Sequence, residues 1–246
     1  MIPTTSPIDA LTTEDRDAMY QLLQRCFQGV TPEVFAADLE DKTLAIRLHD
    51  QAGQLQGFST LALYLTTGAH GEPITVACSG DTIVAPEAWG SSALSRAWIG
   101  EALNWHAQYG VGDLYWLLIT SGFRTYRFLP VFFKTFYPHH NTPSPAVTAA
   151  WMHQLASERW GKAYHRDEGV VRFAHPQRLR DDLAEVPSER LDDPHVATFL
   201  KLNPGHAAGD ELVSLCRIAP DNLTRAGQRM VQGSIRSTTP VAGPTP

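Results

Sequence analysis

Hydrophobic positions within residues 12–39 recur at the spacing of an α-helix, with polar residues between them. Thr12 and Asp15 have the spacing of a capping box, which predicts that a helix begins there. Gly29 ends this helix, and Thr31 followed by Pro32 predicts a second start, because threonine caps helices and proline is tolerated at the first helical position. The hydrophobic positions that these helices would bury are Met19, Leu22, Leu23, Cys26, Phe27, Val34, Phe35 and Leu39.

From residue 43 the pattern changes to extended runs. A turn at residues 50–53 separates the first two runs and predicts a hairpin. Gly80 interrupts the third run, and glycine inside a strand pattern indicates a bulge or a splayed site. A helical pattern returns over residues 91–108, and the apolar run that follows it is typical of a strand buried on both faces. The predicted strands are residues 43–49, 57–67, 73–84 and 114–119.

The rest of the chain is less regular. Residues 123–137 are rich in aromatic side chains, and Pro130 in their middle predicts a short or kinked helix. A loop at 139–145, a helix at 145–160 and a strand at 211–218 follow. The last residues are rich in Pro, Gly, Ser and Thr, which predicts disorder. The predicted parts are a domain at 1–140, a C-terminal extension at 141–231 that packs on it or extends its sheet, and a disordered tail at 232–246.

Composition narrows the function classes. The 246 residues are 43% hydrophobic and 19% charged, with a formal net charge of -6, which argues against a protein that binds nucleic acid mainly through phosphates. Three widely spaced cysteines exclude a disulfide framework. We expect no signal peptide and no membrane span, because no apolar run approaches the ~20 residues that a membrane helix needs. A cytoplasmic protein is therefore expected.

The most informative stretch is a strand, a turn of small residues and a helix at 81–94. Such a turn directs backbone N–H groups and the positive end of the helix at one place, which favours an anion site. A plain connection between strand and helix is the alternative, because small residues also permit a tight turn.

The order of elements over residues 8–140 resembles that of the GNAT-type N-acyltransferases, which use acetyl-CoA. In that family the turn after the fourth strand usually reads Val-x-Pro-x-x-Arg/Gln-x-x-Gly-x-Gly/Ala, and its amides hold the CoA pyrophosphate. Val84 and Pro86 match, Trp89 replaces the Arg/Gln, and Ser92 replaces the first glycine. The resemblance implies an α/β (α+β) fold with a mixed, mostly antiparallel central sheet, flanking helices and two splayed parallel strands.

The resemblance also implies roles for single residues. Asp81 on the fourth strand would be the general base, and Tyr126 would protonate the leaving thiolate. The alternatives are that Asp81 caps a bulge and that Tyr126 is one more core aromatic. The residues expected to contact the thioester donor are Ile83, Val84, Trp89, Gly90, Ser91, Ser92 and Ser121.

The expected activity is transfer of an acetyl or other acyl group to an amine of a small molecule by direct attack. The donor would be acetyl-CoA or another acyl-CoA, and the degenerate turn leaves an acyl carrier protein as a possible donor. A catalytically inactive GNAT-fold protein that binds a small molecule or a protein partner is the alternative. The sequence leaves the oligomeric state open.

Two further features of the sequence carry weaker signals. The adjacent His139 and His140 could be metal ligands, but no carboxylate is spaced to complete a site, so a solvated loop and no metal are expected. Cys78 is expected to be a small buried residue rather than a nucleophile.

Overall fold

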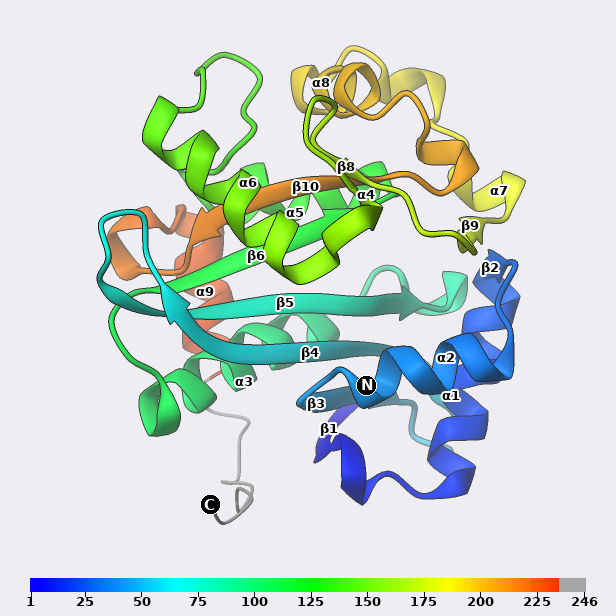
Figure 1. Cartoon of the computed structure of the whole chain (residues 1–246). Coiled ribbons are helices and arrows are strands. Elements are labelled where there is room, and N and C mark those ends of the chain that lie inside the picture. Colours follow the sequence, from blue (N-terminus) through cyan, green and yellow to red (C-terminus); the bar gives the residue numbers. More distant parts are fainter. Residues whose placement is uncertain (235–246) are drawn as a thin grey trace.

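The computed structural model describes residues 1–234 and is built around one mixed β-sheet with helices on both faces (Figure 1). Eight strands form this sheet in the order β1-β3-β4-β5-β6-β10-β8-β7, and β2 and β9 form a separate short ribbon. The strands are β1 Ile2–Pro7, β2 Phe27–Gln28, β3 Leu44–His49, β4 Leu55–Thr67, β5 Pro73–Val84, β6 Leu114–Thr120, β7 Tyr164–His165, β8 Val170–Val171, β9 Arg178–Leu179 and β10 Glu211–Arg217.

The first two helices begin where the sequence predicts. Thr12 Oγ1 accepts the Asp15 amide at 3.1 Å and the Asp15 carboxylate accepts the Thr12 amide at 3.2 Å, so the capping box is complete. Thr31 Oγ1 caps the second helix. The helices are α1 Thr13–Cys26, α2 Pro32–Glu40, α3 Ala93–Tyr109, α4 Phe123–Tyr126, α5 Phe128–Phe132, α6 Ala146–Trp160, α7 Asp181–Ala184, α8 Pro194–Leu202 and α9 Arg225–Ser234.

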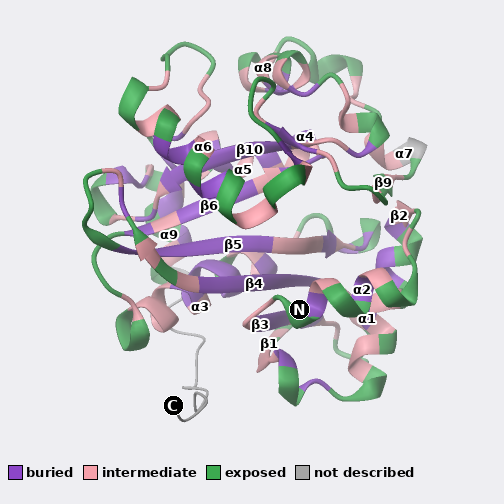
Figure 2. Ribbon diagram, in the orientation of Figure 1, coloured by how far each residue is buried: buried purple, intermediate pink, exposed green. Residues whose placement is uncertain are grey.

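Alternation along the strands divides the core between the two faces of the sheet. On one face, side chains of β3 to β6 and β10 pack with α3, α4, α5, α8 and α9. On the other face, one cluster packs beneath α6 and a second beneath α1 and α2. The buried strands at the centre and the exposed outer faces of the helices are visible in Figure 2.

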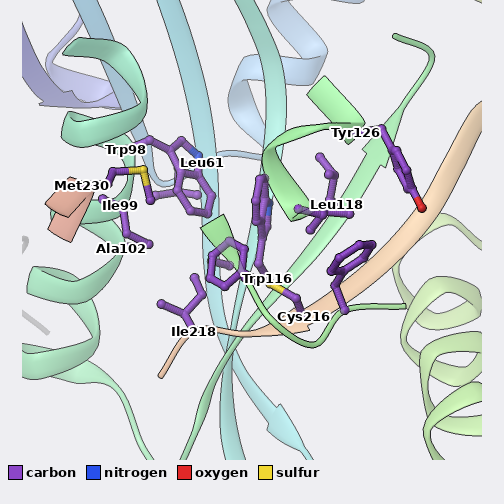
Figure 3. Close-up of a cluster of buried hydrophobic side chains, with 14 of the residues drawn as sticks. Leu61, Trp98, Ile99, Ala102, Trp116, Leu118, Tyr126, Cys216, Ile218 and Met230 are labelled. Atoms are coloured by element: carbon purple, nitrogen blue, oxygen red, sulfur yellow. The ribbon is translucent and has the colours of Figure 1, made fainter. Parts of the chain in front are cut away.

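The core of the first face is rich in aromatic side chains (Figure 3). Trp98 of α3 lies against Trp116 of β6, with 4.7 Å between their ring centroids. Met230 of α9 packs in the same cluster. Tyr126 lies at the far end of this core, fully buried.

The fold class expected from the sequence is confirmed. The sheet is mostly antiparallel, and β5 and β6 are its parallel pair. The aromatic stretch forms two short helices, with Pro130 inside α5. The predicted extension at 141–231 contributes β7, β8 and β10 to the same sheet. The predicted disordered tail at 232–246 starts within α9, and residues 235–246 lie outside the described residues.

Several elements were missed by the sequence reasoning, among them β1, β7, β8 and α8. β1 is short, and two of its six residues are proline, which conceals its strand pattern. The small strands β7 and β8 have two residues each and owe their structure to pairing with β10. α8 begins with Pro194 directly after a capping aspartate, Asp193, and this start signal was overlooked. Within residues 1–234, no helix has the length and apolar character needed to cross a membrane.

Gly112 lies in the connection that leads into β6, and its substitution tests the backbone conformation there. Its φ is +56°, and a Cβ there would overlap the carbonyl oxygen of Pro73 at the start of β5. Gly112→Ala should therefore lower the free energy of unfolding by about 2–4 kcal/mol, because backbone strain and a steric clash add. Gly90→Ala is the control, since Gly90 has open space around it. Urea unfolding would measure both variants, and equal stabilities would contradict the structure.

Candidate active site

The site lies where β5 and β6 stop pairing. Their parallel register runs from Thr75 opposite Leu114 to Cys78 opposite Leu117, and no pair follows. Just beyond this point, β5 contains a bulge. Its Ser79 faces Leu61 of β4 and its Thr82 faces Ser59, so β5 has one residue more than β4 over this interval. The sequence predicted this irregularity from Gly80.

The bulge determines where Asp81 lies. Before it, Cys78 packs in the cluster beneath α6, and after it Ile83 packs in the cluster beneath α1 and α2, on the same face of the sheet. The extra residue thus reverses the alternation and places Asp81 on that face as well. Glu211 opens β10, and by alternation with Val213 and Leu215 of the cluster beneath α6 it shares this face.

A buried lysine reaches the bulge from the end of α2. The Lys42 side chain is only 5% exposed, and its Nζ donates to Asp38 Oδ1 at 2.7 Å and to the Asp38 carbonyl at 2.9 Å. Its aliphatic part crosses Gly80, where a Cβ would overlap Lys42 Cε and Thr60 Oγ1. Glycine at the bulge is therefore required for the lysine to lie there.

Lys42 acts electrostatically on Asp81 and Glu211 as well as on its partner Asp38, and its Nζ also lies 3.5 Å from Asp41 Oδ2. Burial, then the charge of Asp38, raises the pKa of Asp81 to about 7, while Lys42 acts in the opposite direction. Burial, then the charges of Asp81 and Asp38, raises the pKa of Glu211 to about 8. The charge of Asp81 acts on Glu211, so the two side chains lie within electrostatic reach across the gap between the strands. At neutral pH this group of side chains both holds and accepts protons.

Several polar atoms at the bulge lack a partner. Asp81 Oδ2, Asp38 Oδ2 and Thr60 Oγ1 are buried and make no hydrogen bond within residues 1–234. Buried polar atoms are nearly always hydrogen-bonded, and exceptions gather where a ligand or water binds. These three atoms are therefore free to hydrogen-bond with water or with a polar group of a ligand.

The turn that follows β5 leaves backbone donors unpaired at the start of a helix. The amides of Gly90 and Ser92 meet no acceptor in the described part of the chain, and they precede the 17-residue helix α3. Ser91 does not share this feature, because its amide donates to the Ala88 carbonyl and its Oγ accepts from the amide of Ala93.

Trp89 occupies the position of the family's Arg/Gln and has a different role. Its exposed indole donates to the Val84 carbonyl at 2.9 Å. The Arg124 guanidinium of α4 stacks on the Trp89 ring, 4.7 Å from its centroid, and donates to the Leu183 carbonyl at 2.8 Å. Among the carboxylates whose side chains the structure describes, none pairs with Arg124. The Arg124 guanidinium of α4 therefore places a positive charge beside the turn.

Tyr126 is not brought to this site. It is fully buried among Phe136 and Phe199, and its hydroxyl donates to the Pro138 carbonyl at 3.0 Å. Burial raises its pKa further above the usual range. The geometry gives no support to the acid role expected from the sequence, and it favours the alternative, a core aromatic.

The other expected donor contacts lie around the gap. Ile83 and Val84 pair with Phe58 and Gly57 of β4. Ser121 is buried directly after the last residue of β6.

The described surface contains at least two hollows. The smaller, about 300 Å³, is lined by Asp41, Tyr64 and Arg159 among others, close to Lys42 and Cys78. Cys78 itself is buried, as the sequence predicts, 3.7 Å from the Tyr64 hydroxyl. The larger, about 560 Å³, lies at the other end of β6 and β10 and is lined by none of the expected site residues.

Several charged residues of the site were missed by the sequence reasoning. In the sequence, Asp38 and Lys42 have the pattern of polar residues on the exposed side of a surface helix. Only the packing of α2 on the sheet brings them to β5. Glu211 carried a signal that could have been used, since it is an acid at the start of an otherwise buried strand. His195 of α8 lies beside His139 and His140, which the sequence placed in a solvated loop.

Comparisons with known proteins return no matching protein-family model and no matching curated protein. Solved structures do resemble the chain. A probable N-acyltransferase of unknown function from Enterococcus faecalis is 17% identical, with a TM-score of 0.41, over 55% of this chain and 33% of its own. A GNAT-family N-acetyltransferase from Escherichia coli, solved in complex with CoA, is 18% identical, with a TM-score of 0.35, over 48% of this chain and 63% of its own.

The ribosomal-protein-S18-alanine N-acetyltransferase from Escherichia coli is 16% identical, with a TM-score of 0.37, over 91% of this chain and 99% of its own. This chain thus spans one third of the Enterococcus protein and under two thirds of the first Escherichia coli protein. The mostly antiparallel sheet and its one parallel pair, splayed at a bulge, give the chain a GNAT-like fold.

The raised pKa of Asp81 predicts a pH dependence of stability. The folded protein holds this proton more tightly than the unfolded chain, so the stabilisation is complete below pH 4 and is lost as the pH rises through about 7. Asp81→Asn removes this loss. The variant should gain about 1 kcal/mol or more relative to the wild type between pH 5 and pH 8.5. Urea unfolding at both pH values measures it, with the exposed Asp17→Asn as control. A difference that does not change with pH would contradict the assignment.

Proposed function

We propose that this protein is an acyltransferase that moves an acyl group from a CoA thioester to the amine of a small molecule. The observation that carries the proposal is the buried, unpartnered carboxylate oxygen of Asp81, which lies where the parallel strands separate. A gap between strands admits an extended thioester arm, and a carboxylate with a pKa near neutrality is suited to remove a proton from an amine.

The reaction is a single direct attack. The amine nitrogen forms a bond to the thioester carbonyl carbon, its proton passes to the Asp81 carboxylate, and the carbon–sulfur bond breaks to release the thiolate. Unpaired backbone amides at the gap would polarise the carbonyl oxygen as negative charge develops on it. Asp81 can act as the base at neutral pH while its neighbour Glu211 stays uncharged, because Glu211 retains its proton at that pH.

The proton for the leaving sulfur needs a source other than Tyr126, whose hydroxyl is committed to the Pro138 carbonyl. We assign this role to Glu211. It shares the face of the sheet with Asp81 and is electrostatically coupled to it. Its raised pKa means that it carries a proton when Asp81 is free to accept one, which is the division of labour expected for an acid and a base in one site.

The donor would be held mainly by the turn before α3. The free amides of Gly90 and Ser92 would bind a phosphate, and Arg124 would supply the charge that the family's Arg/Gln supplies elsewhere. Glu87, which adds negative charge to this turn, is paired with Arg25 at 3.2 Å. An acyl group on the phosphopantetheine arm of a carrier protein would use the same gap and is a second possible donor.

The acceptor would approach from the face of α2 and α6. Even with Glu211 protonated, acidic side chains outnumber basic ones there, which favours a cationic amine over an anionic acceptor; the acids are Asp38, Asp41, Asp81 and Glu158, against Lys42 and Arg159. The hollow of about 300 Å³ beside Tyr64 and Asp41 lies on this face and has room for a small molecule. A small amine is therefore the proposed acceptor class, and its identity is left to a substrate screen.

Two contacts favour the alternative, a GNAT-fold protein that binds without catalysis. The Val84 carbonyl, which a thioester arm would use, already accepts the Trp89 indole, and the Tyr126 hydroxyl is unavailable. An acyltransferase and a non-catalytic binding protein would both bind a thioester ligand or a related molecule. Only the acyltransferase would release free thiol from acetyl-CoA in the presence of an amine.

Asp81→Asn tests the base. With an amine identified by screening against acetyl-CoA, the substitution should lower kcat by about 10²–10⁴ and abolish the rise of kcat/KM with an inflection near pH 7. Thiol release followed by a chromogenic reagent measures both. Asp17→Asn on the exposed side of α1 controls for loss of one charge. A wild type that binds acetyl-CoA yet releases no thiol with any amine supports the non-catalytic alternative.

Arg124→Gln tests the donor site. Calorimetric titration should show CoA binding weakened about tenfold or more, because a charge-assisted contact to phosphate is worth about 1.5–3 kcal/mol. Pantetheine, which lacks the phosphates, should bind both proteins equally. Arg166→Gln, an exposed arginine in the turn between β7 and β8, is the matched control. Equal weakening of CoA and pantetheine would show that Arg124 only supports the local structure.

A further inference from the structure

Three histidines from distant parts of the chain converge on one spot away from the proposed active site. His139 and His140 follow α5, and His195 is the second residue of α8. The ring centroids are 4.5 Å apart for His139 and His140, 5.4 Å for His139 and His195, and 4.3 Å for His140 and His195. Each ring offers one nitrogen to a common point, and the three nitrogens lie within 4.8 Å of one another.

The segments that carry these rings are held by the core. Phe136 packs against the rings of both His139 and His195. The Tyr126 hydroxyl fixes the Pro138 carbonyl, one residue before His139. On the other side, the Asp193 carboxylate accepts the His195 amide at 2.9 Å and caps α8, so the His195 backbone is fixed as well. The rings therefore meet on a preformed support.

The surroundings leave the rings ready to bind a cation. His195 Nδ1 is buried and has no hydrogen-bond partner within residues 1–234, although a buried imidazole nitrogen normally has one. His140 is exposed, yet its ring turns toward the other two rather than into solvent.

We propose that His139, His140 and His195 bind one divalent transition-metal ion of the zinc class. Neutral imidazole nitrogens are ligands of choice for zinc, and three of them with an open fourth position form a common arrangement. Zinc–nitrogen bonds of about 2.0–2.1 Å place tetrahedral ligands about 3.4 Å apart, so the rings need only small rotations to close on an ion.

His139 has one hydrogen bond at a ring nitrogen. His139 Nδ1 accepts the Asn141 amide at 3.3 Å, a long hydrogen bond that is readily replaced. The exposed position of His140 leaves the fourth ligand site open to water or to a small solute. The ion would join the loop after α5 to the first turn of α8, two segments that are 55 residues apart in the sequence.

The test uses the full chain with no affinity tag. Zn²⁺ titrated into the metal-free protein at pH 7.5, in competition with a chromophoric chelator, should bind at one equivalent per chain. Co²⁺, the spectroscopic substitute for Zn²⁺, should give the intense visible absorption of a four-coordinate site. Zn²⁺ should also raise the midpoint of thermal unfolding, because a ligand that binds only the folded state stabilises it.

Matched variants locate the site. His140→Gln changes an exposed side chain and should weaken Zn²⁺ binding at least about tenfold while leaving the metal-free unfolding midpoint unchanged. His195→Gln should do the same to binding. His206→Gln is the control. His206 also packs on Phe199 of α8, but it lies outside the cluster of three histidines and its Nδ1 hydrogen-bonds to the Asn203 carbonyl.

Two outcomes would overturn the inference. One is a wild type that takes up Zn²⁺ no more tightly than His140→Gln. The other is a loss in His206→Gln equal to that in His140→Gln, which would place the binding elsewhere. A variant that unfolds in the metal-free state would be recognised by circular dichroism, and His140→Gln, which alters no core contact, then decides the question.

Discussion

The backbones of β5 and β6 cease to hydrogen-bond after Cys78 and Leu117, and the rest of the site depends on how this gap is kept open. Unpaired strand backbone is costly inside a protein, so both strands must find other partners. β4 holds β5 on one side, and β10 holds β6 on the other. On the face of α3, the Trp116 indole donates to Ser79 Oγ at 2.8 Å and spans the point where the strands part.

The charges around the bulge follow from the same gap. A carboxylate in a closed sheet would be forced to find a partner, but at an opening it can remain unpaired and hold a proton near neutral pH. Lys42 lies 5% exposed over Gly80 and is satisfied by Asp38. It limits the rise in the pKa values of Asp81 and Glu211 without neutralising either. The raised pKa values lower the free energy of unfolding at high pH, but they leave Asp81 and Glu211 able to exchange protons near neutral pH.

Much of the fold follows from local sequence signals. The caps at Thr12 and Thr31, the glycine in β5 and the apolar run of β6 each act through neighbouring residues, and all were interpreted correctly. The site is harder, because its members meet only in three dimensions. Asp81 was found on the strand, whereas Lys42 and Glu211 come from elements far from it in the sequence. Tyr126 shows the reverse case: its spacing matched the family, but the packing of α8 against α4 enclosed its ring in the core.

The place of β10 in the sheet has a consequence for synthesis of the chain. β6 pairs with β5 through a few residues and has its other edge covered by a strand that begins about ninety residues later. At a translation rate of about 5–20 residues per second, that edge stays open for about 5–20 s after β6 leaves the ribosome. An apolar strand with an open edge is a template for wrong pairing. The nascent chain is therefore most prone to aggregate in this interval, and chaperones that shield strand edges have the most to contribute then.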